Sequence, residues 1–222
     1  MPEPIKVLSD FAIGESVFLN ENGSPAEYLV VNQGVPSNSS LYDSSCDGVW
    51  LLRKDIHSER EWNDSNANLY SYSTINTFLN GDFLNSFTSE VRAAIKQVKI
   101  PYNASGAKVS TKVFLLGAVE IGNLPDGAGY MYAQDDGAKL EYFYEGLDTA
   151  QNARRKAKLD GASCIWWLRT VRPSGTTNGV YVRKDGYFHS VGVTEVHGIR
   201  PALILPSTAL FDPDTLEFVG VK

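Results

Sequence analysis

Two apolar stretches near the end of the chain decide the fold: SCIWWLRTVR at residues 163–172 and GIRPALILPS at residues 198–207. Each is typical of a buried β-strand, with Arg169 beside the first apolar run and Arg200 beside the second. The segment between them, TVRPSGTTNGVYVRKDGYFHSVGVTEVH at 170–197, has no consistent polarity. We therefore expect two buried strands that enclose a segment without the apolar pattern of a core element.

The composition indicates a well-packed acidic protein. Hydrophobic residues make up 43% of the 222 residues and aromatic residues 11%, which is enough for a large core. The 20 basic and 26 acidic residues give a net charge of −6, which disfavours nucleic acid as a partner. The N-terminus lacks the apolar segment of a signal peptide, and no apolar run approaches the roughly 20 residues of a membrane-spanning helix. We expect a soluble chain without membrane insertion, folded as a single domain over residues 1–222.

The pattern of apolar and turn residues predicts an α+β fold, mostly short antiparallel strands with two or three short helices and much loop. After residue 162 every segment is typical of β-structure, and Asp185-Gly186 between two alternating arms predicts a hairpin. Asn22-Gly23 is a second turn signal. Earlier strands are predicted at 15–19, 27–31, 48–56 and 112–119, and a helix or polar turn at 148–159. Helices are predicted at 73–80, with Ser73 or Thr74 as the cap and Gly81 as the end, and at 89–98, with Ser89 as the cap.

Catalytic and metal-binding motifs are absent from the sequence. His57, His189 and His197 do not have the spacing of metal ligands, and no hydrolase, nucleotide-binding or zinc-protease motif is present. Asp135-Asp136 before Gly137 faintly resembles a calcium loop, but the EF-hand spacing and its terminal glutamate are missing, so turn chemistry explains the pair better. We expect no cofactor, no metal site and no enzymatic activity.

The two cysteines leave alternatives open. Cys46 and Cys164 are far apart and outside any paired spacing, so they are either free thiols or one disulfide. Cys164 with His189 or His197 could form a nucleophile pair, but a thiol in an apolar strand is usually inert.

The aromatic and basic residues of the two anchoring stretches are predicted to be structural. Trp166 and Trp167 point to opposite faces if they share a strand, so one fills the core and the other packs under a helix, lines a binding surface or is buried too. Arg169 and Arg200 lie next to apolar runs, where a charge needs a partner. We expect each arginine to meet a carboxylate or backbone carbonyls.

The enclosed segment is the candidate binding region. Alternation places Tyr181 and Arg183 on one face of a strand, and Tyr187 and His189 share a face beyond the turn. Tyrosine, arginine and histidine combine apolar area with hydrogen bonding, as binding hot spots do. An ordinary exposed hairpin is the alternative. The predicted contacts are Val171, Arg172, Thr176, Thr177, Tyr181, Arg183, Asp185, Tyr187, His189, Val191, Val193, Glu195 and His197.

These residues also carry a resemblance to a known family. WWLRT, a diverse segment and then GIRPALILPST resemble a domain of unknown function that is widespread in gut bacteria and their phages, in which WWLRS precedes a diverse segment and G-[VI]-RPAL-x-L. The resemblance extends over about residues 4–210. Further matching stretches are FAIGESVFLNENGSPAEYLVV, YDSSCDGVWLLRKDI, STINTFLNGDFLNSF, AIKQVKIPY and DGAKLEYF. One departure is Thr170-Val171, where the family usually has serine and then proline.

The resemblance implies a function that composition does not. Similar proteins are targets of diversity-generating retroelements, which rewrite codons near the 3′ end of one gene. Their implied fold is C-type-lectin-like, with the rewritten residues on an exposed binding face, here 170–197. The implied partner is a protein or glycan receptor on a cell surface, and the implied location is a phage tail or a prophage product, where homotrimers are common. The alternatives are a bacterial surface adhesin or an enzyme similar to formylglycine-generating enzymes, although the paired active-site cysteines of those enzymes have no counterpart here.

Overall fold

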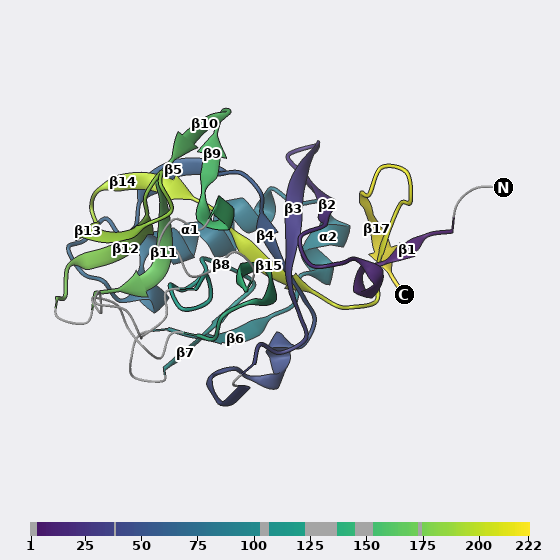
Figure 1. Cartoon of the computed structure of the whole chain (residues 1–222), viewed down its shortest axis with the longest axis horizontal. Helices are drawn as coiled ribbons and strands as arrows, with labels where there is room; N and C mark the ends of the chain where they lie inside the picture. The colour runs from purple at the N-terminus through teal and green to yellow at the C-terminus, as the bar shows by residue number, and fades with distance from the viewer. Residues whose placement is uncertain (1–3, 38, 103–106, 123–136, 145–152, 173–174) are drawn as a thin grey trace.

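A computed structural model describes residues 4–37, 39–102, 107–122, 137–144, 153–172 and 175–222 (Figure 1). The fold is β-rich, since strands make up 40% of the described residues and helices of all types 19%. The predicted α+β class with a C-type-lectin-like fold is therefore wrong. Apart from 3-10 turns, helical structure in the described residues is limited to two segments: α1 covers Thr74–Phe78 and a π-helix continues it over Leu79–Phe83, and α2 covers Ser89–Ala94.

Five strands form the sheet that we call the frame sheet, in the order β2-β3-β4-β15-β8. Asn22 and Gly23 both have positive φ and join β2 to β3, so this predicted turn is confirmed. β4 and β15 occupy the middle and are buried almost throughout, which explains their unbroken apolar sequence. The strand predicted at 112–119 is much shorter. The strands are β2 (Ser16–Glu21), β3 (Ser24–Gln33), β4 (Val49–Arg53), β8 (Val113–Phe114) and β15 (Ala202–Leu205).

A second five-stranded sheet, the outer sheet, has the order β13-β12-β11-β14-β5 and lies at the left in Figure 1. The hairpin predicted at Asp185-Gly186 is confirmed and joins β12 to β13. β11 and β14 pair in parallel, whereas the other pairs of this sheet are antiparallel. The strands are β5 (Ser58–Glu61), β11 (Trp166–Val171), β12 (Asn178–Val182), β13 (Phe188–Gly192) and β14 (Val196–Ile199).

The GIRPALILPS stretch belongs to both large sheets. β14 ends at Ile199 in the outer sheet and β15 begins at Ala202 in the frame sheet. Arg200 and Pro201 form the junction, and Pro201 supplies no N–H for either ladder. A stretch that resembles one strand is thus two strands in two sheets.

Three small sheets complete the β-structure of the described residues. Residues 153–159, from the predicted helix or polar turn at 148–159, form a 3-10 turn and a strand instead. The earlier part of that segment lies outside the described residues. The strands are β1 (Lys6–Val7), β16 (Ala209–Phe211) and β17 (Phe218–Val221), then β6 (Val98–Pro101) and β7 (Lys108–Thr111), and β9 (Ala157–Leu159) and β10 (Ala162–Cys164).

The first helix has its predicted cap, whereas the second is capped by Thr88, whose side chain accepts a hydrogen bond from the Val91 N–H at 3.4 Å, and not by the predicted Ser89. The Ser73 side chain accepts a hydrogen bond from the Asn76 N–H, as expected of a helix cap. The helix then runs through Gly81, because Leu79 and Phe83 are anchored in the core on either side of it. Short 3-10 turns are found at Leu8–Asp10, Ser39–Leu41, Ser44–Cys46, Tyr70–Tyr72, Glu141–Phe143 and Ala153–Arg155.

Buried residues from Leu8 to Phe211 form one contiguous hydrophobic cluster. All four tryptophans are fully buried in it. The β1-β16-β17 sheet, with the C-terminus, lies at the right of Figure 1, opposite the outer sheet. No helix in the described part of the chain is long and apolar enough to cross a bilayer.

Candidate ligand-binding surface

Four ring-bearing side chains gather across the outer sheet. Tyr181 pairs with Trp167 on one side and with His189 on the other, so the three lie in a row over β11, β12 and β13. His197 on β14 completes the group, with its ring centroid 4.4 Å from that of Trp167 and 4.7 Å from that of Tyr181. We call Trp167, Tyr181, His189 and His197 the ring cluster.

Trp167 forms the base of the ring cluster. It is fully buried, and its indole Nε1 donates a hydrogen bond to the Arg60 carbonyl oxygen at 3.1 Å. Gly179 leaves room for the ring, since a Cβ there would lie 3.2 Å from Trp167 Cζ3. Trp166 faces the other way, and its Nε1 donates to the Arg155 carbonyl oxygen at 2.9 Å. Both tryptophans are therefore buried, and only Trp167 supports the cluster.

His197 is half-buried and is held as an uncharged ring. Its Nδ1 lies at hydrogen-bonding distance from the Val196 carbonyl oxygen, whereas Nε2 has no partner among the described residues. Burial lowers the pKa of His197, with the carboxylates of Glu195 and Glu59 opposing the shift. A neutral imidazole with one vacant nitrogen is suited to accept a hydrogen bond if its neighbours move aside.

The rim of this surface is formed by the β12–β13 turn. Arg183 Nη2 and Asp185 Oδ2 are 3.0 Å apart, and Asp185 Oδ1 accepts a hydrogen bond from the Tyr187 N–H at 3.1 Å. Tyr187 exposes 38% of its area and His189 is exposed, so both present ring edges to solvent. The turn therefore offers cationic, aromatic and hydrogen-bonding groups close together.

The predicted contact residues separate by burial. Val171 and Val193 are in the core, at 7% and 0% exposure, so they cannot meet a ligand, and including them was wrong. Val193 is drawn inward because its backbone carbonyl accepts hydrogen bonds from the N–H groups of Trp62 and Asn63. The exposed contacts are Thr176, Arg183, Tyr187, His189 and Glu195, and the partly exposed ones are Arg172, Thr177, Tyr181, Asp185, Val191 and His197.

Sequence reasoning missed Arg60 and Phe78, which adjoin this surface. Arg60 pairs with His197 across β5 and β14, and its guanidinium lies 3.3 Å from the centre of the Phe78 ring. More than a hundred residues separate Arg60 from its strand partner, so no local pattern could have joined them.

Arg169 is part of a buried ion pair. Its two terminal nitrogens donate to the two carboxylate oxygens of Glu120 at 2.6 Å each, and both side chains are fully buried. Tyr42 donates to the same carboxylate at 2.9 Å, and the Gly117 N–H donates at 2.8 Å. Arg169 also donates to the carbonyl oxygens of Pro101 and Leu115. The structure thus gives Arg169 a carboxylate and backbone carbonyls as partners.

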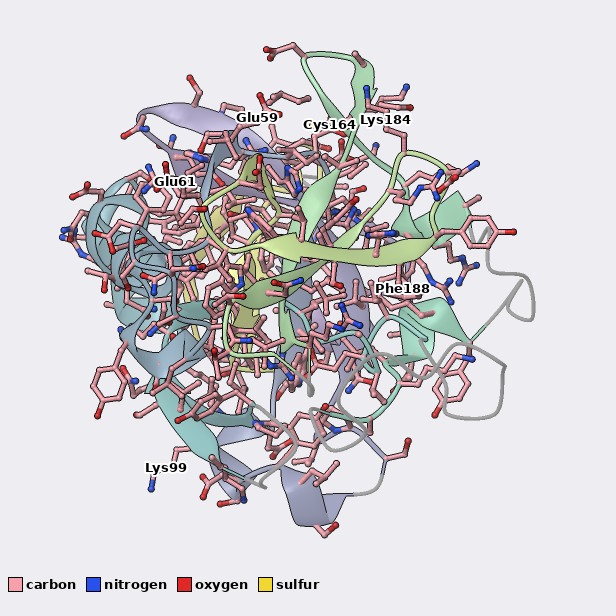
Figure 2. The ribbon with its side chains drawn as sticks, turned by 90° about the vertical axis from the view of Figure 1, so that its left-hand side faces the viewer. Glu59, Glu61, Lys99, Cys164, Lys184 and Phe188 are labelled. Carbon is pink, nitrogen blue, oxygen red and sulfur yellow. The ribbon has the colours of Figure 1, made fainter. Side chains whose placement is uncertain are left out.

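Cys164 is the last residue of β10, two residues before β11 of the outer sheet begins. Its Sγ is 3.4 Å from Glu59 Oε1, and Figure 2 shows these two residues with Lys184 nearby. Burial raises the pKa of the thiol, and the Glu59 carboxylate raises it further. The thiol is therefore mostly protonated at neutral pH, which makes it a weak nucleophile. Cys46 and Cys164 are both free, so they do not form a disulfide.

Metal ligands do not gather in the part of the chain that the structure covers, where no group of three or more His, Cys, Asp or Glu side chains is placed to hold an ion. Asp135 and Asp136, the faint calcium-loop signal, lie outside the described residues.

Stability should rise with pH between about 5.5 and 7.5, because burial lowers the pKa of both His57 and His197. Both histidines have pKa values near 6.5 when unfolded, so within this window the unfolded chain binds more protons than the folded one. The contribution of the two histidines to the free energy of unfolding is complete above their pKa in the unfolded chain. It is lost as the pH falls toward their lower pKa values in the folded protein. Urea unfolding at both ends of the window measures it. The double variant His57→Gln/His197→Gln should flatten the slope, and an unchanged slope would contradict this assignment.

The fold and the surface define a β-rich protein that presents aromatic and basic side chains at one end. Residues 47–207 match the family described as "Domain of unknown function (DUF6273)", a match that covers well over half of the chain. The protein therefore belongs to this family. No curated protein and no solved structure matches the chain.

Proposed function

We propose that this protein is a non-catalytic binding protein whose ligand surface is the exposed face of the outer sheet. The observation that carries the proposal is that Arg183 and Tyr187 are exposed beside each other at the β12–β13 turn, next to the paired rings of Tyr181 and His189. Rigid aromatic rings and an arginine on a packed base are the features that concentrate binding energy in protein interfaces. The base is Trp167, which the core holds fixed.

The proposed surface is separated physically from the residues that stabilise the fold. Arg183, Tyr187, His189 and Glu195 are exposed, whereas the strands beneath them carry Val180 and Val182 at 0% exposure. Exposed side chains away from special features change stability little when replaced. The surface can therefore take new side chains without loss of the fold, which a diversified binding region requires.

The resemblance to targets of diversity-generating retroelements extends this proposal. On that basis residues 170–197 are the diversified segment, and the protein recognises a protein or glycan receptor from a phage tail or a prophage particle. A bacterial cell-surface adhesin is the alternative. The genome tests this part: a neighbouring reverse transcriptase with a template repeat of the 3′ end supports diversification, and their absence removes it. Adjacent tail genes support the phage origin, and adjacent cell-wall anchoring genes support the adhesin.

A triple variant tests the binding surface itself. In Arg183→Ala/Tyr187→Ala/His189→Ala we expect the melting temperature to change by less than about 2 °C. Binding of the labelled protein to a glycan array and to a panel of gut bacterial cells should weaken at least about 100-fold, because three contact side chains are lost. Tyr181 is left intact, because its ring packs on Trp167 and His197.

The matched control is Tyr72→Ala/Lys99→Ala/Lys108→Ala, which also removes one exposed tyrosine and two exposed nitrogen-bearing side chains. It should bind as the natural chain does. Equal binding by both triple variants would refute the proposed surface, and so would loss of folding in the first one.

A further inference from the structure

A second concave region lies away from the rim of the outer sheet. It is a cleft of about 570 Å³ where the start of β2, the end of β4 and the β9 strand meet. The backbone of β9 is tied to the chain after β4, because the Ile56 N–H donates to the Lys158 carbonyl oxygen at 2.8 Å. We call it the Arg200 cleft, after the residue at its base.

The Arg200 cleft concentrates positive charge in an acidic protein. Its lining includes five basic side chains and one acidic one, whereas the whole chain carries a net charge of −6. A recess lined by one sign of charge focuses the field and attracts the opposite ion. The charged lining residues are Lys54, Arg154, Lys156, Lys158, Arg200 and Asp55.

Arg200 is a buried cation with an incomplete set of hydrogen bonds. Only 2% of the residue is exposed, and its guanidinium lies 5.2 Å from the centre of the Trp166 ring. Nε donates to the Arg53 carbonyl oxygen at 2.9 Å, but Nη1 is buried and has no hydrogen-bond partner among the described residues. Burial lowers the pKa of Arg200 to about 10, so the side chain is still charged at neutral pH. A buried charge without a full set of partners is costly, and an oxyanion would complete the set.

The walls of the cleft differ in how far their charges are neutralised. Lys54 is 2.8 Å from Glu27 and so is already paired. Arg154 lies over the Tyr142 ring at 4.8 Å, which fixes one wall. Lys156 and Lys158 are exposed at the mouth: Lys156 joins the 3-10 turn to β9, and Lys158 lies on β9. These two lysines would meet an approaching anion first.

We propose that the Arg200 cleft binds a small oxyanion, a ligand with a phosphate or carboxylate group, with Arg200 at the base and Lys156 and Lys158 at the mouth. The residues that line the cleft lie outside segment 170–197. This proposal therefore does not depend on the proposed binding surface of the outer sheet. Two sources share this chemistry: a free phosphate, or the carboxylate of an acidic sugar.

Calorimetric titration tests the proposal with inorganic phosphate and with D-glucuronate. The reference ligands are D-glucose, which has no charge, and potassium chloride at the same ionic strength as the phosphate and glucuronate solutions. The variant Lys156→Gln/Lys158→Gln removes two exposed charges from the mouth and leaves the buried base unchanged. We expect it to bind the anions about tenfold more weakly than the natural chain. The variant Lys99→Gln/Lys108→Gln makes the same change of net charge on β6 and β7, and it should bind as the natural chain does.

The outcomes separate clearly. Tighter binding of phosphate identifies a free oxyanion as the ligand type, and tighter binding of glucuronate identifies an acidic sugar. Equal anion affinity in the two lysine variants overturns the proposal, and so does a response no larger than that to chloride. The variant Arg200→Lys gives a second measurement. It keeps the positive charge but loses the planar set of guanidinium N–H donors, so it should also bind the anions more weakly.

Discussion

Replacing Arg169 with methionine should lower the free energy of unfolding by about 3 to 5 kcal/mol. The change leaves the Glu120 carboxylate in the core with no cation, and both side chains of the pair are fully buried. It also removes the donors to the carbonyl oxygens of Pro101 and Leu115. Urea unfolding followed by tryptophan fluorescence measures the loss.

Two controls define this effect. The exposed pair Arg183–Asp185 has side chains about half exposed, so Arg183→Gln should cost no more than about 1 kcal/mol. The double variant Arg169→Met/Glu120→Gln should be more stable than the sum of its single variants predicts, because the unpaired charge is gone. If Arg169→Met lowers the free energy of unfolding by less than about 1 kcal/mol, the buried Arg169–Glu120 pair does not stabilise the fold as proposed.

Replacing Gly198 with alanine should cost about 1 to 3 kcal/mol, because the added methyl group has no room. Its Cβ would lie 2.7 Å from the Ile165 carbonyl oxygen and 2.8 Å from Ile56 Cγ2. The oxygen cannot easily retreat, since it accepts the Gly198 N–H at 3.1 Å where β11 and β14 pair in parallel. Thermal and urea unfolding of the variant measure the cost.

Gly192→Ala is the matched control in the same sheet. The nearest atom to its added Cβ would be Thr194 Oγ1 at 4.0 Å, so stability should change little. If both alanine variants are equally stable, close packing is not the reason for a glycine at position 198.

Local features of the fold were predictable from the sequence, because a few adjacent residues determine them. Asn22-Gly23 and Asp185-Gly186 predicted their hairpins, and Ser73 predicted its helix cap. The end at Gly81 was wrong, since the apolar residues on either side of it hold the helix in the core. The α+β class was wrong because short helical patterns were given too much weight beside many short strands.

Contacts between residues far apart in the chain could not be predicted from the sequence. Glu120 is one of 26 acidic residues, and nothing near it marks it as the partner of Arg169. The junction at Arg200 and Pro201 divides an apparently continuous strand between two sheets. The prediction that Val171 and Val193 are exposed contacts was also wrong, since a register shift and a tight turn place these side chains in the core.

The antiparallel pairing of β12 with β13 has a consequence for the entropy of the turn that joins them. It places Val182 beside Phe188, so both ends of that turn are fastened to neighbouring positions of a packed sheet. For a flexible segment closed in this way, each doubling of length costs only about 0.6 kcal/mol. Foreign loops of different lengths should therefore be graftable between these two strands, and the Arg169–Glu120 pair would anchor the recipient scaffold.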